Sequence, residues 1–502
     1  MNPTMQGPDD FEFLSVRRRV RDAADWNRAD WPLLWRYHLH YFDDLNAVNC
    51  RARADWHRAL IERWIAENPP AEGVGWDPYP TSLRIVNWIK WWLGGASASN
   101  GSLVSVGIQL AHLEPRLEYH LLGNHLFENA KALIFGGLFF DGEAANRWLR
   151  RGLAILARQL PEQILDDGGH FERSPMYHQI VLAGLLDLYN VMRVFDRRER
   201  LDLVPNIRRM LRWSALMRHP DGDISLFNDA AFHEAPVAQS LENYAAGMGI
   251  ELPPAEAPSS EAAGVHLKPS GYVRVVRFPY TALLNVGSVG PDYQPGHAHA
   301  DTLSFELSAM GRRLIVDTGT STYDRGPVRA WERGSAAHNT VIVDGLNSSD
   351  VWGGFRVARR ARILAATVAS DADTTTVAAA HDGYRRLPAR AVHERRWEFS
   401  VDQMRIDDVV SGRGEVNLDL VLNIHPDFTI LQTSAHRFMI RSIDQAIAVI
   451  IDTPSELKPR IADFSFAHRF GSTRPGARIV ASARVRLPQA LRTTVRFSHG
   501  GA

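Results

Sequence analysis

The segment PGHAHADTLSFEL, residues 295–307, brings two imidazoles and a carboxylate close together in the sequence. His297, His299 and Asp301 stand two residues apart, and in an extended chain residues at this spacing project from one face. If the segment is extended, all three side chains could therefore meet one site, and the alternative for Asp301 is that it caps or braces the loop. Imidazole and carboxylate groups bind metals and transfer protons, so the segment predicts a metal or a catalytic site.

Two residues further along the chain are expected to join this site. The run TLSFELSAMGRRLIVDTGT predicts a hairpin that turns at Met310 and Gly311 and returns Asp317 toward His299. His338, in RGSAAHNTV, stands just before another predicted strand. Two imidazoles and a carboxylate suit zinc, with a fourth position left for water. The alternative, in a chain with 20 histidines, is three unrelated residues at strand ends.

His297 stands one residue from a predicted ligand but is free to point elsewhere. A neutral imidazole at this position can act as a general base. The alternatives are a second metal ligand or a loop residue that is hydrogen-bonded to the backbone.

Tyr177 is placed at the start of a predicted helix. In FERSPMYHQ, Ser174 and Pro175 have the order of an N-cap and a first helical residue, so Tyr177 falls in the first turn. The helix dipole and free backbone N–H groups favour negative charge there, either a phenolate or an anionic substrate. Alternatively, Tyr177 packs against the preceding loop.

A second helix start carries amide, imidazole and carboxylate groups. GNHLFENAKAL begins with Gly123, which predicts Asn124 as the N-cap, His125 and Glu128 in the first turn and Asn129 just beyond. Capping and ordinary first-turn chemistry explain these residues without a function. The functional alternative is that Asn124 and His125 contact a substrate carboxylate and Glu128 orients one of them.

The rest of the chain predicts a multidomain α+β protein. Residues 30–220 repeat apolar side chains at helical spacing, as in ANRWLRRGLAILARQL, which suggests paired helices in a ring or superhelix. ELPPAEAPSSEAAG, residues 251–264, is a predicted linker. The alternating runs that follow indicate an antiparallel sandwich. The expected domains are therefore 1–250, helical, and 265–502, a β-sandwich.

The amino-acid composition limits which classes of binding partner are expected. Lys plus Arg and Asp plus Glu both number 57, so neither a nucleic acid nor an anionic membrane is the expected partner, whereas an acidic substrate needs only a local patch. Cys50 is the single cysteine, which excludes an intramolecular disulfide. The first thirty residues lack a signal-peptide core and no later run would span a bilayer, so the expectation is a soluble chain without an export signal.

Five motifs, in order, resemble the heparinase II/III-like polysaccharide lyases, which include heparin-sulfate and oligoalginate lyases: NHLFENAKAL, GGHFERSPMYHQ, GHAHADTLSFEL, VDTGT and RGSAAHNTV. The resemblance extends over most of the chain from about residue 30. It implies an N-terminal incomplete α/α toroid followed by a C-terminal antiparallel β-sandwich. It also implies an acidic polysaccharide as substrate, either a heparan-sulfate-like glycosaminoglycan or a bacterial exopolysaccharide. Most relatives are exported, so the resemblance implies a periplasmic location, whereas the missing signal sequence leaves a cytoplasmic location as the alternative.

The resemblance also assigns roles to residues. Asn124 is similar to the residue that neutralises the uronate carboxylate, His125 to its neighbour, Tyr177 to the catalytic tyrosine and His297 to the catalytic histidine. Three further residues resemble the ligands of a zinc ion, expected here in a structural role: His299, Asp317 and His338.

The implied reaction is β-elimination. Removal of the weakly acidic C5 proton builds charge on the neighbouring carboxylate, which fixed amide and imidazole donors stabilise. If the C5 proton and O4 lie on one side of the ring, Tyr177 serves as base and acid; if they lie on opposite sides, His297 is the base and Tyr177 the acid. The product carries a C4–C5 double bond and no water is consumed.

Seven residues near these motifs are further candidates for substrate contacts, with a structural role as the alternative for each: Trp76, Tyr79, Arg84, Asn87, Glu128, Arg173 and Arg333. Two other functions remain as alternatives. A toroid glycoside hydrolase needs two carboxylates, for which the candidates are Asp166, Asp167, Glu172 and Asp229. Hydrolysis leaves the Asn, Tyr and His set unexplained. A non-catalytic exopolysaccharide-binding protein has no need to keep that set.

Overall fold

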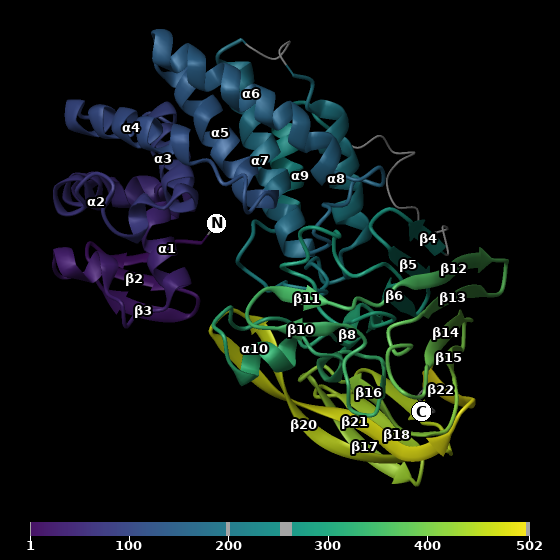
Figure 1. The fold of residues 1–502 in the computed structure, drawn as a ribbon. Coiled ribbons are helices and arrows are strands. Elements are labelled where there is room, and N and C mark those ends of the chain that lie inside the picture. The colour runs from purple at the N-terminus through teal and green to yellow at the C-terminus, as the bar shows by residue number, and fades with distance from the viewer. Residues whose placement is uncertain (1, 197–200, 252–263, 498–502) are drawn as a thin grey trace. The chain divides into compact units, whose positions relative to one another are not determined.

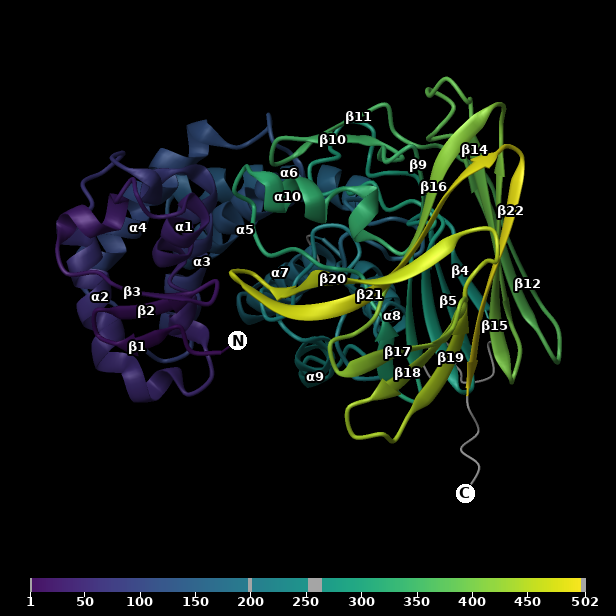
Figure 2. The ribbon, with the colours of Figure 1, turned by 90° about the horizontal axis from the view of Figure 1, so that it is seen from below.

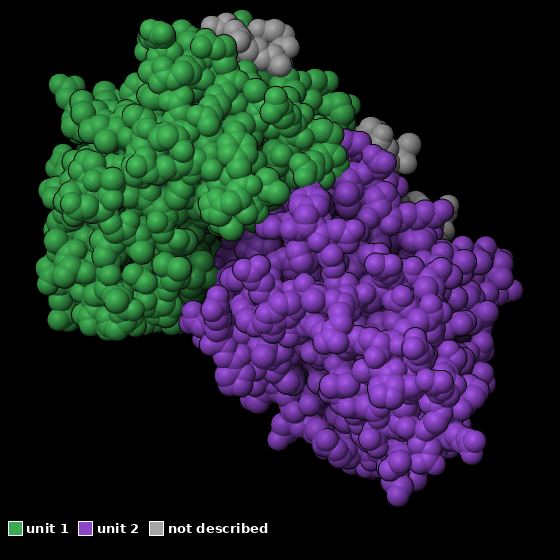
Figure 3. All heavy atoms as spheres, viewed as in Figure 1, with its two compact units in different colours: residues 1–164, 179–208, 235–251 green, residues 165–178, 209–234, 252–502 purple. Residues whose placement is uncertain are grey.

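The computed structural model describes residues 2–196, 201–251 and 264–497 (Figure 1). Its chain divides into two compact units, which Figure 3 colours separately. Unit 1 consists of residues 1–164, 179–208 and 235–251, and unit 2 of residues 165–178, 209–234 and 252–502. The helical half of the chain therefore contributes to both units. The predicted linker, 251–264, lies almost wholly outside the described residues.

Unit 1 is built mainly of helices (Figure 1). They are α1 (Leu33–Tyr41), α2 (Ala54–Glu67), α3 (Pro78–Leu93), α4 (Asn100–Leu113), α5 (Gly123–Phe139), α6 (Glu143–Gln163) and α9 (Ala238–Gly247). Two more helices begin in one unit and end in the other: α7 (Pro175–Val194) and α8 (Val204–Leu216). A small antiparallel sheet precedes them: β1 (Met5–Gly7), β2 (Asp10–Phe13) and β3 (Val16–Arg19).

The core of unit 1 is rich in tryptophan, and α5 lies at its centre. Almost every side chain of α5 is buried. A Cβ on Gly137 would lie 2.5 Å from the backbone nitrogen of Leu149, and one on Gly152 would lie 2.8 Å from the Ala130 carbonyl oxygen. Glycine at both positions therefore allows α5 and α6 to pack closely. Buried tryptophans of the first hundred residues include Trp26, Trp31, Trp35, Trp76, Trp88, Trp91 and Trp92.

Unit 2 contains the other antiparallel sheets. A five-stranded sheet has the order β4 (Gly264–Leu267), β5 (Tyr272–Arg277), β6 (Tyr280–Asn285), β7 (Phe305–Ala309), β8 (Arg312–Ile315). An eight-stranded sheet has the order β12 (Ile363–Ser370), β13 (Thr375–His381), β14 (Val392–Phe399), β15 (Gln403–Ser411), β22 (Gln489–Phe497), β19 (Ala448–Asp452), β18 (Arg437–Ser442), β17 (Phe428–Ser434).

Two smaller sheets complete unit 2 (Figure 2). The four-stranded sheet has the order β20 (Lys458–Arg469), β21 (Ser472–Arg486), β16 (Glu415–Asn423), β9 (Val341–Val343), and β20 and β21 form its long hairpin. The two-stranded sheet pairs β10 (Asp350–Trp352) with β11 (Arg356–Ala358). A short helix, α10 (Pro327–Glu332), lies between β8 and β9 in the sequence.

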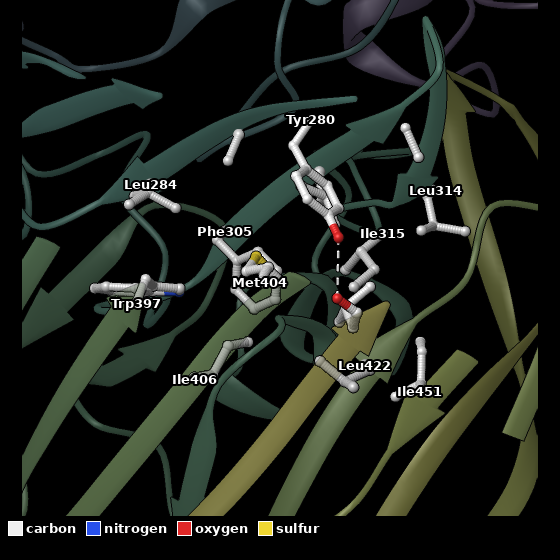
Figure 4. Close-up of a cluster of buried hydrophobic side chains, with 14 of the residues drawn as sticks. Tyr280, Leu284, Phe305, Leu314, Ile315, Trp397, Met404, Ile406, Leu422 and Ile451 are labelled. Atoms are coloured by element: carbon white, nitrogen blue, oxygen red, sulfur yellow. Dashed lines mark hydrogen bonds between the residues drawn. The ribbon is translucent and has the colours of Figure 1, made fainter. Parts of the chain in front are cut away.

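The main core of unit 2 joins side chains of the five-stranded and the eight-stranded sheets (Figure 4). Leu284 and Phe305 come from the first sheet, and Trp397 and Ile406 from the second. The hydroxyl of Tyr280 donates to the Val495 carbonyl over 3.0 Å, which satisfies the one polar atom that this tyrosine brings into the core. The predicted arrangement of helices followed by antiparallel sheets is confirmed.

Local predictions had mixed outcomes. β7 and β8 form the predicted hairpin, and Met310 and Gly311 at its turn both have positive φ angles. No helix among the described ranges is long and apolar enough to cross a lipid bilayer.

The predicted start of α5 was wrong. This helix begins at Gly123, and its N-cap is Leu122, whose side chain makes no capping hydrogen bond. Asn124 is therefore the second helical residue, and Glu128 belongs to the second turn. Since Asn124 does not cap the helix, its amide is not explained by capping.

Candidate active site

A tyrosine and a histidine from distant parts of unit 2 form the centre of the candidate site. The rings of Tyr177 and His297 stack with their centroids 3.9 Å apart. Tyr177 lies in the first turn of α7, where the Ser174 hydroxyl accepts a hydrogen bond from its backbone N–H over 3.2 Å, so the predicted N-cap is confirmed. The hydroxyl of Tyr177 lies 3.1 Å from that of Tyr323. Two groups that can transfer protons therefore lie side by side.

His297 belongs to the loop between β6 and β7. This loop is not a strand, so the expected extended conformation of residues 295–300 was wrong. His297 and His299 nevertheless meet at one carboxylate: Nδ1 of His297 lies 2.9 Å from Oδ2 of Asp229, and Nε2 of His299 lies 2.8 Å from Oδ1. Asp301 does not join them, because it accepts a hydrogen bond from Asn285 and braces the loop.

Asp229 is fully buried and holds the site together electrostatically. Arg329 of α10 donates to both of its carboxylate oxygens, the Nη2–Oδ2 distance being 2.7 Å. Burial alone would raise the pKa of Asp229, but Arg329 and the two histidine hydrogen bonds outweigh it and hold that pKa well below its ordinary value. Asp229 is therefore ionised and fixes the Nδ1 proton on His297.

Backbone contacts around Asp229 fix the positions of Tyr177 and His297. The backbone N–H of Asp229 donates to the His297 carbonyl over 3.0 Å, and the Ser174 hydroxyl donates to the Asp229 carbonyl over 2.5 Å. The preceding residue, Asn228, accepts from the backbone N–H of His299 and donates to the Arg173 carbonyl. The segment containing Asn228 and Asp229 thus connects the start of α7 to the loop that carries His297.

Carboxylates lie on both sides of the His297 ring. Its Nε2 atom is 3.3 Å from Oε2 of Glu172, which is buried just before α7, while Asp229 faces Nδ1. Positive charge that develops on the ring during proton transfer is therefore stabilised. Burial, followed by the neighbouring Tyr323 and the charges of Asp229 and Glu172, raises the pKa of Tyr177 well above its ordinary value. Tyr177 is a neutral phenol in this environment.

The predicted zinc ligands lie close together, but their arrangement suits a metal only in part. Nδ1 of His338 is 2.7 Å from Oδ2 of Asp317, and the rings of His299 and His338 are 5.4 Å apart. The remaining ring nitrogens, Nδ1 of His299 and Nε2 of His338, are buried and have no hydrogen-bond partner in the described parts of the chain. No three His, Cys, Asp or Glu side chains within these parts are placed as a metal centre.

In unit 1, Asn124 and His125 lie at the start of α5. Nδ1 of His125 is 3.0 Å from Oε1 of Glu118, and its ring packs against Tyr79 with a centroid distance of 4.4 Å. The His125 side chain is 31% exposed, whereas Asn124 is buried. His125 and Tyr79 therefore form one partly exposed aromatic pair. Both residues are predicted to contact substrate.

Two other predicted substrate residues of unit 1 are held by polar contacts within that unit. Arg84 is fully buried; its guanidinium donates to Gln109 and to the Gly75 carbonyl and lies 3.8 Å from the Trp64 ring centroid. Asn87 donates to Asp43 and to the Tyr41 carbonyl.

Two more of these residues are buried too. The Trp76 ring lines an apolar cavity of about 420 Å³. Glu128 pairs with Lys131 at 3.3 Å. Such placements favour the structural alternative for Arg84, Asn87 and Glu128.

The two arginines predicted from the flanks of motifs in unit 2 brace its loops. Arg173 has a positive φ angle and donates to the Ser288 carbonyl. Arg333 is buried, and its guanidinium donates twice to the Ala298 carbonyl, between the two histidines of the loop. Arg333 thus holds His297 in position without being exposed to a ligand.

Four contributors to the site were not recognised from the sequence in these roles. Tyr323 and Arg329 had not been singled out, and Asp229 and Glu172 were considered only as hydrolase carboxylates. The available signal was the aromatic and basic run STYDRGPVRA directly after VDTGT. Nothing in its spacing indicates that Arg329 reaches a carboxylate one hundred residues earlier.

The fold and the site define a helical domain followed by an antiparallel β-sandwich with a Tyr–His pair. Two family descriptions match this chain, "Heparinase II/III N-terminus" over residues 60–248 and "Heparinase II/III-like, C-terminal" over residues 260–496. The chain belongs to the heparinase II/III-like family.

Individual relatives differ in how much of the chain they match. A heparin-sulfate lyase of Bacteroides stercoris is 27% identical over 251 residues, which are 46% of this chain and 37% of the lyase. The chain thus matches little more than a third of that lyase's length. FtsZ-localized protein C of Caulobacter vibrioides is 26% identical over 427 residues, which are 80% of this chain and 67% of that protein.

Among solved structures, the crystal structure of heparinase III has a TM-score of 0.76 and 17% identity, and the alignment covers 97% of this chain and 80% of that one. Similarity at this identity concerns the fold. It confirms the predicted class, an incomplete α/α toroid followed by an antiparallel β-sandwich.

The Arg329–Asp229 pair leads to a test of stability. Arg329→Met leaves the buried Asp229 charge without its main partner, so we expect a loss of about 3–5 kcal/mol in the free energy of unfolding. Urea denaturation at neutral pH, followed by tryptophan fluorescence, measures it. The double variant Arg329→Met/Asp229→Asn removes the stranded charge and is expected to lose less than the sum of the single variants.

Arg441→Met, at an exposed position of β18, is the matched control and should change stability by no more than about 0.5 kcal/mol. Strict additivity of the two single substitutions would contradict the proposed coupling.

Proposed function

We propose that the protein is a polysaccharide lyase that cleaves a uronic-acid-containing polysaccharide by β-elimination. The observation that carries the proposal is the stacked Tyr177–His297 pair with a carboxylate at each nitrogen of the imidazole. Membership of the heparinase II/III-like family supports it. The substrate class is an acidic polysaccharide, either a heparan-sulfate-like glycosaminoglycan or a bacterial exopolysaccharide.

In the proposed reaction a base removes the C5 proton of the uronate. The electron pair of the C5–H bond forms the C4–C5 double bond, the C4–O4 bond breaks, and O4 leaves with a proton from an acid. Charge accumulates on the uronate carboxylate in between. Asn124 and His125 are proposed to neutralise it, since amide and imidazole donors stabilise a developing oxyanion.

The surroundings of Tyr177 support its role as the acid. Its raised pKa keeps the hydroxyl protonated, and a protonated phenol can donate to O4 but cannot begin as the base. His297 is then the base: its Nδ1–H is held by Asp229, and the proton that arrives at Nε2 lies between the ring and Glu172. These roles suit a substrate whose C5 proton and O4 lie on opposite faces of the sugar.

Substitution of the pair tests the mechanism. We expect Tyr177→Phe and His297→Ala each to reduce kcat by about 10²–10⁴-fold with the fold intact, because general acid–base groups contribute that much. The assay is the rise in ultraviolet absorbance from the unsaturated uronate, with heparan sulfate, heparin, hyaluronan, alginate and bacterial exopolysaccharides as substrates. Tyr280→Phe, the same change in the core of unit 2, is the matched control and should keep kcat.

The pH profile of kcat separates the two possible roles of Tyr177. An acid with a raised pKa stays competent as the pH increases, so activity should not depend on ionisation of Tyr177 at alkaline pH. A base would require the phenolate, and activity would climb with pH toward the tyrosine pKa. A climb that disappears in Tyr177→Phe would contradict the assignment, and near-normal activity of Tyr177→Phe would remove its role altogether.

We also propose that one zinc ion binds His299, Asp317 and His338 in a structural role. The support is the two buried imidazole nitrogens without hydrogen-bond partners, Nδ1 of His299 and Nε2 of His338, and the Asp317 carboxylate at the other nitrogen of the His338 ring. Bound there, zinc would connect the loop before β7 with the segment before β9.

Metal analysis tests the zinc proposal. Protein purified without chelators is expected to contain about one zinc per chain, and His338→Ala should lose it because a ligand is gone. His381→Ala, at another fully buried histidine of unit 2, is the control and should keep its metal. Zinc-free wild-type protein, or zinc retained by His338→Ala, would exclude this ligand set.

A second candidate function is a role without turnover. It is favoured by the match to FtsZ-localized protein C, which extends over more of this chain than the match to the Bacteroides stercoris lyase. Co-sedimentation with FtsZ polymers, together with absence of cleavage on every polysaccharide tested, would support it. Elimination activity that depends on Tyr177 and His297 would favour the lyase instead.

A further inference from the structure

A small hairpin of unit 2 lies beside the Tyr177–His297 pair and has no role in the chemistry proposed above. It consists of β10 and β11, which form a sheet of their own (Figure 2). Its tip has the sequence WGGFR, residues 352–356. Gly353 has a φ angle of 57°, a conformation that suits glycine in a tight turn.

The tip of this hairpin is fixed against the reaction centre. The Phe355 ring lies 5.9 Å from that of His297 and 5.1 Å from that of Tyr323, measured between centroids. The Gly354 carbonyl accepts two hydrogen bonds from Arg329, at 3.0 and 3.1 Å. Arg329 is also the partner of Asp229, so one guanidinium fixes both the catalytic carboxylate and the hairpin.

Two side chains of the hairpin remain available to a ligand. Trp352 and Arg356 stand directly opposite each other in the strand register, so both side chains leave the hairpin on the same face. Trp352 is 50% exposed and Arg356 is exposed as well. Within the part of the chain that the structure describes, no ion pair joins Arg356 to an acidic side chain, whereas the nearby Arg359 and Arg360 both have such partners.

The chemistry of this pair matches one monosaccharide of an acidic polymer. An indole offers a flat apolar face on which the C–H face of a sugar ring can stack. Because the indole is rigid, its side chain loses little conformational entropy on binding. A guanidinium binds a carboxylate or a sulfate ester through two parallel hydrogen bonds. An exposed tryptophan beside a cation contributes nothing to the core of unit 2, so a structural role does not explain it.

We propose that Trp352 and Arg356 form a substrate subsite next to the reaction centre, where Trp352 stacks on a sugar ring and Arg356 binds the anionic group of that sugar. The inference rests on the proposed lyase function and adds to it the residues that recognise the neighbouring unit. Because the subsite binds ground state and transition state alike, it acts on KM more than on kcat.

Kinetics of two hairpin variants test the subsite. Trp352→Ala and Arg356→Gln are each expected to raise KM about tenfold while kcat stays within about twofold. The effect of Arg356→Gln should shrink as salt is added, since its contact is ionic. Matched controls are Phe278→Ala, a 75% exposed aromatic in the turn between β5 and β6, and Arg441→Gln, exposed on β18; both should behave as wild type.

Two substrates identify the anionic group that Arg356 binds. If Arg356→Gln raises KM for heparan sulfate but not for its unsulfated precursor polymer, the group is a sulfate ester. If it raises KM for both, the group is the carboxylate. Unchanged KM with both substrates in both variants would overturn the subsite.

Binding to an inactive variant separates this inference from the proposed function. In a Tyr177→Phe background, calorimetric titration with heparan sulfate should show affinity that falls about tenfold when Trp352→Ala is added. If the wild-type protein cleaves the polymer but the added Trp352→Ala substitution leaves the affinity unchanged, the subsite alone is overturned. Absence of both binding and cleavage by wild-type protein, on every uronate polymer tested, overturns the proposed function and the subsite with it.

Discussion

The site depends on one buried charge, the Asp229 carboxylate. A carboxylate in an apolar interior is costly unless it is paired and hydrogen-bonded, and Asp229 receives Arg329 and two imidazoles. Arg329 comes from α10, whereas both imidazoles come from the loop between β6 and β7. Satisfying one charge therefore brings together the loop between β6 and β7, α10 and the segment after α8.

The same carboxylate determines the chemistry that the pair can perform. Asp229 fixes the tautomer of His297 by accepting its Nδ1 proton, which leaves Nε2 as the reactive nitrogen. Its negative charge also contributes to the raised pKa of Tyr177, so the tyrosine is kept as a phenol next to a histidine that can accept a proton. The opposite roles proposed for the two stacked rings thus follow from their shared electrostatic surroundings.

Much of the architecture could be predicted from local sequence patterns. Helical periodicity, β alternation and the Ser174–Pro175 order each concern residues that are neighbours in the chain, and those predictions were confirmed. The hairpin turn at Met310 and Gly311 belongs to the same class. The start of α5 was predicted wrongly, because a glycine before an asparagine can lie inside a helix as well as before one.

The candidate site could be predicted only in part. His297, His299 and Tyr177 were found because their motifs are local, but Arg329 and Tyr323 were not. Arg329 reaches Asp229 across one hundred residues and Tyr323 reaches Tyr177 across 146, and such contacts depend on tertiary packing. The partners of buried polar groups are equally hidden from the sequence: substrate contact and a structural role were both open for Arg333, and its guanidinium donates to the Ala298 carbonyl.

The most direct test of the central claim is the fate of solvent oxygen during cleavage. The polysaccharide that gives the strongest response is digested in ¹⁸O-labelled water, and the new chain ends are examined by mass spectrometry. Elimination predicts unsaturated products without solvent oxygen, because the O4 atom stays on the leaving sugar and no water is consumed. Saturated products that carry one ¹⁸O per cleavage would contradict the account and establish hydrolysis.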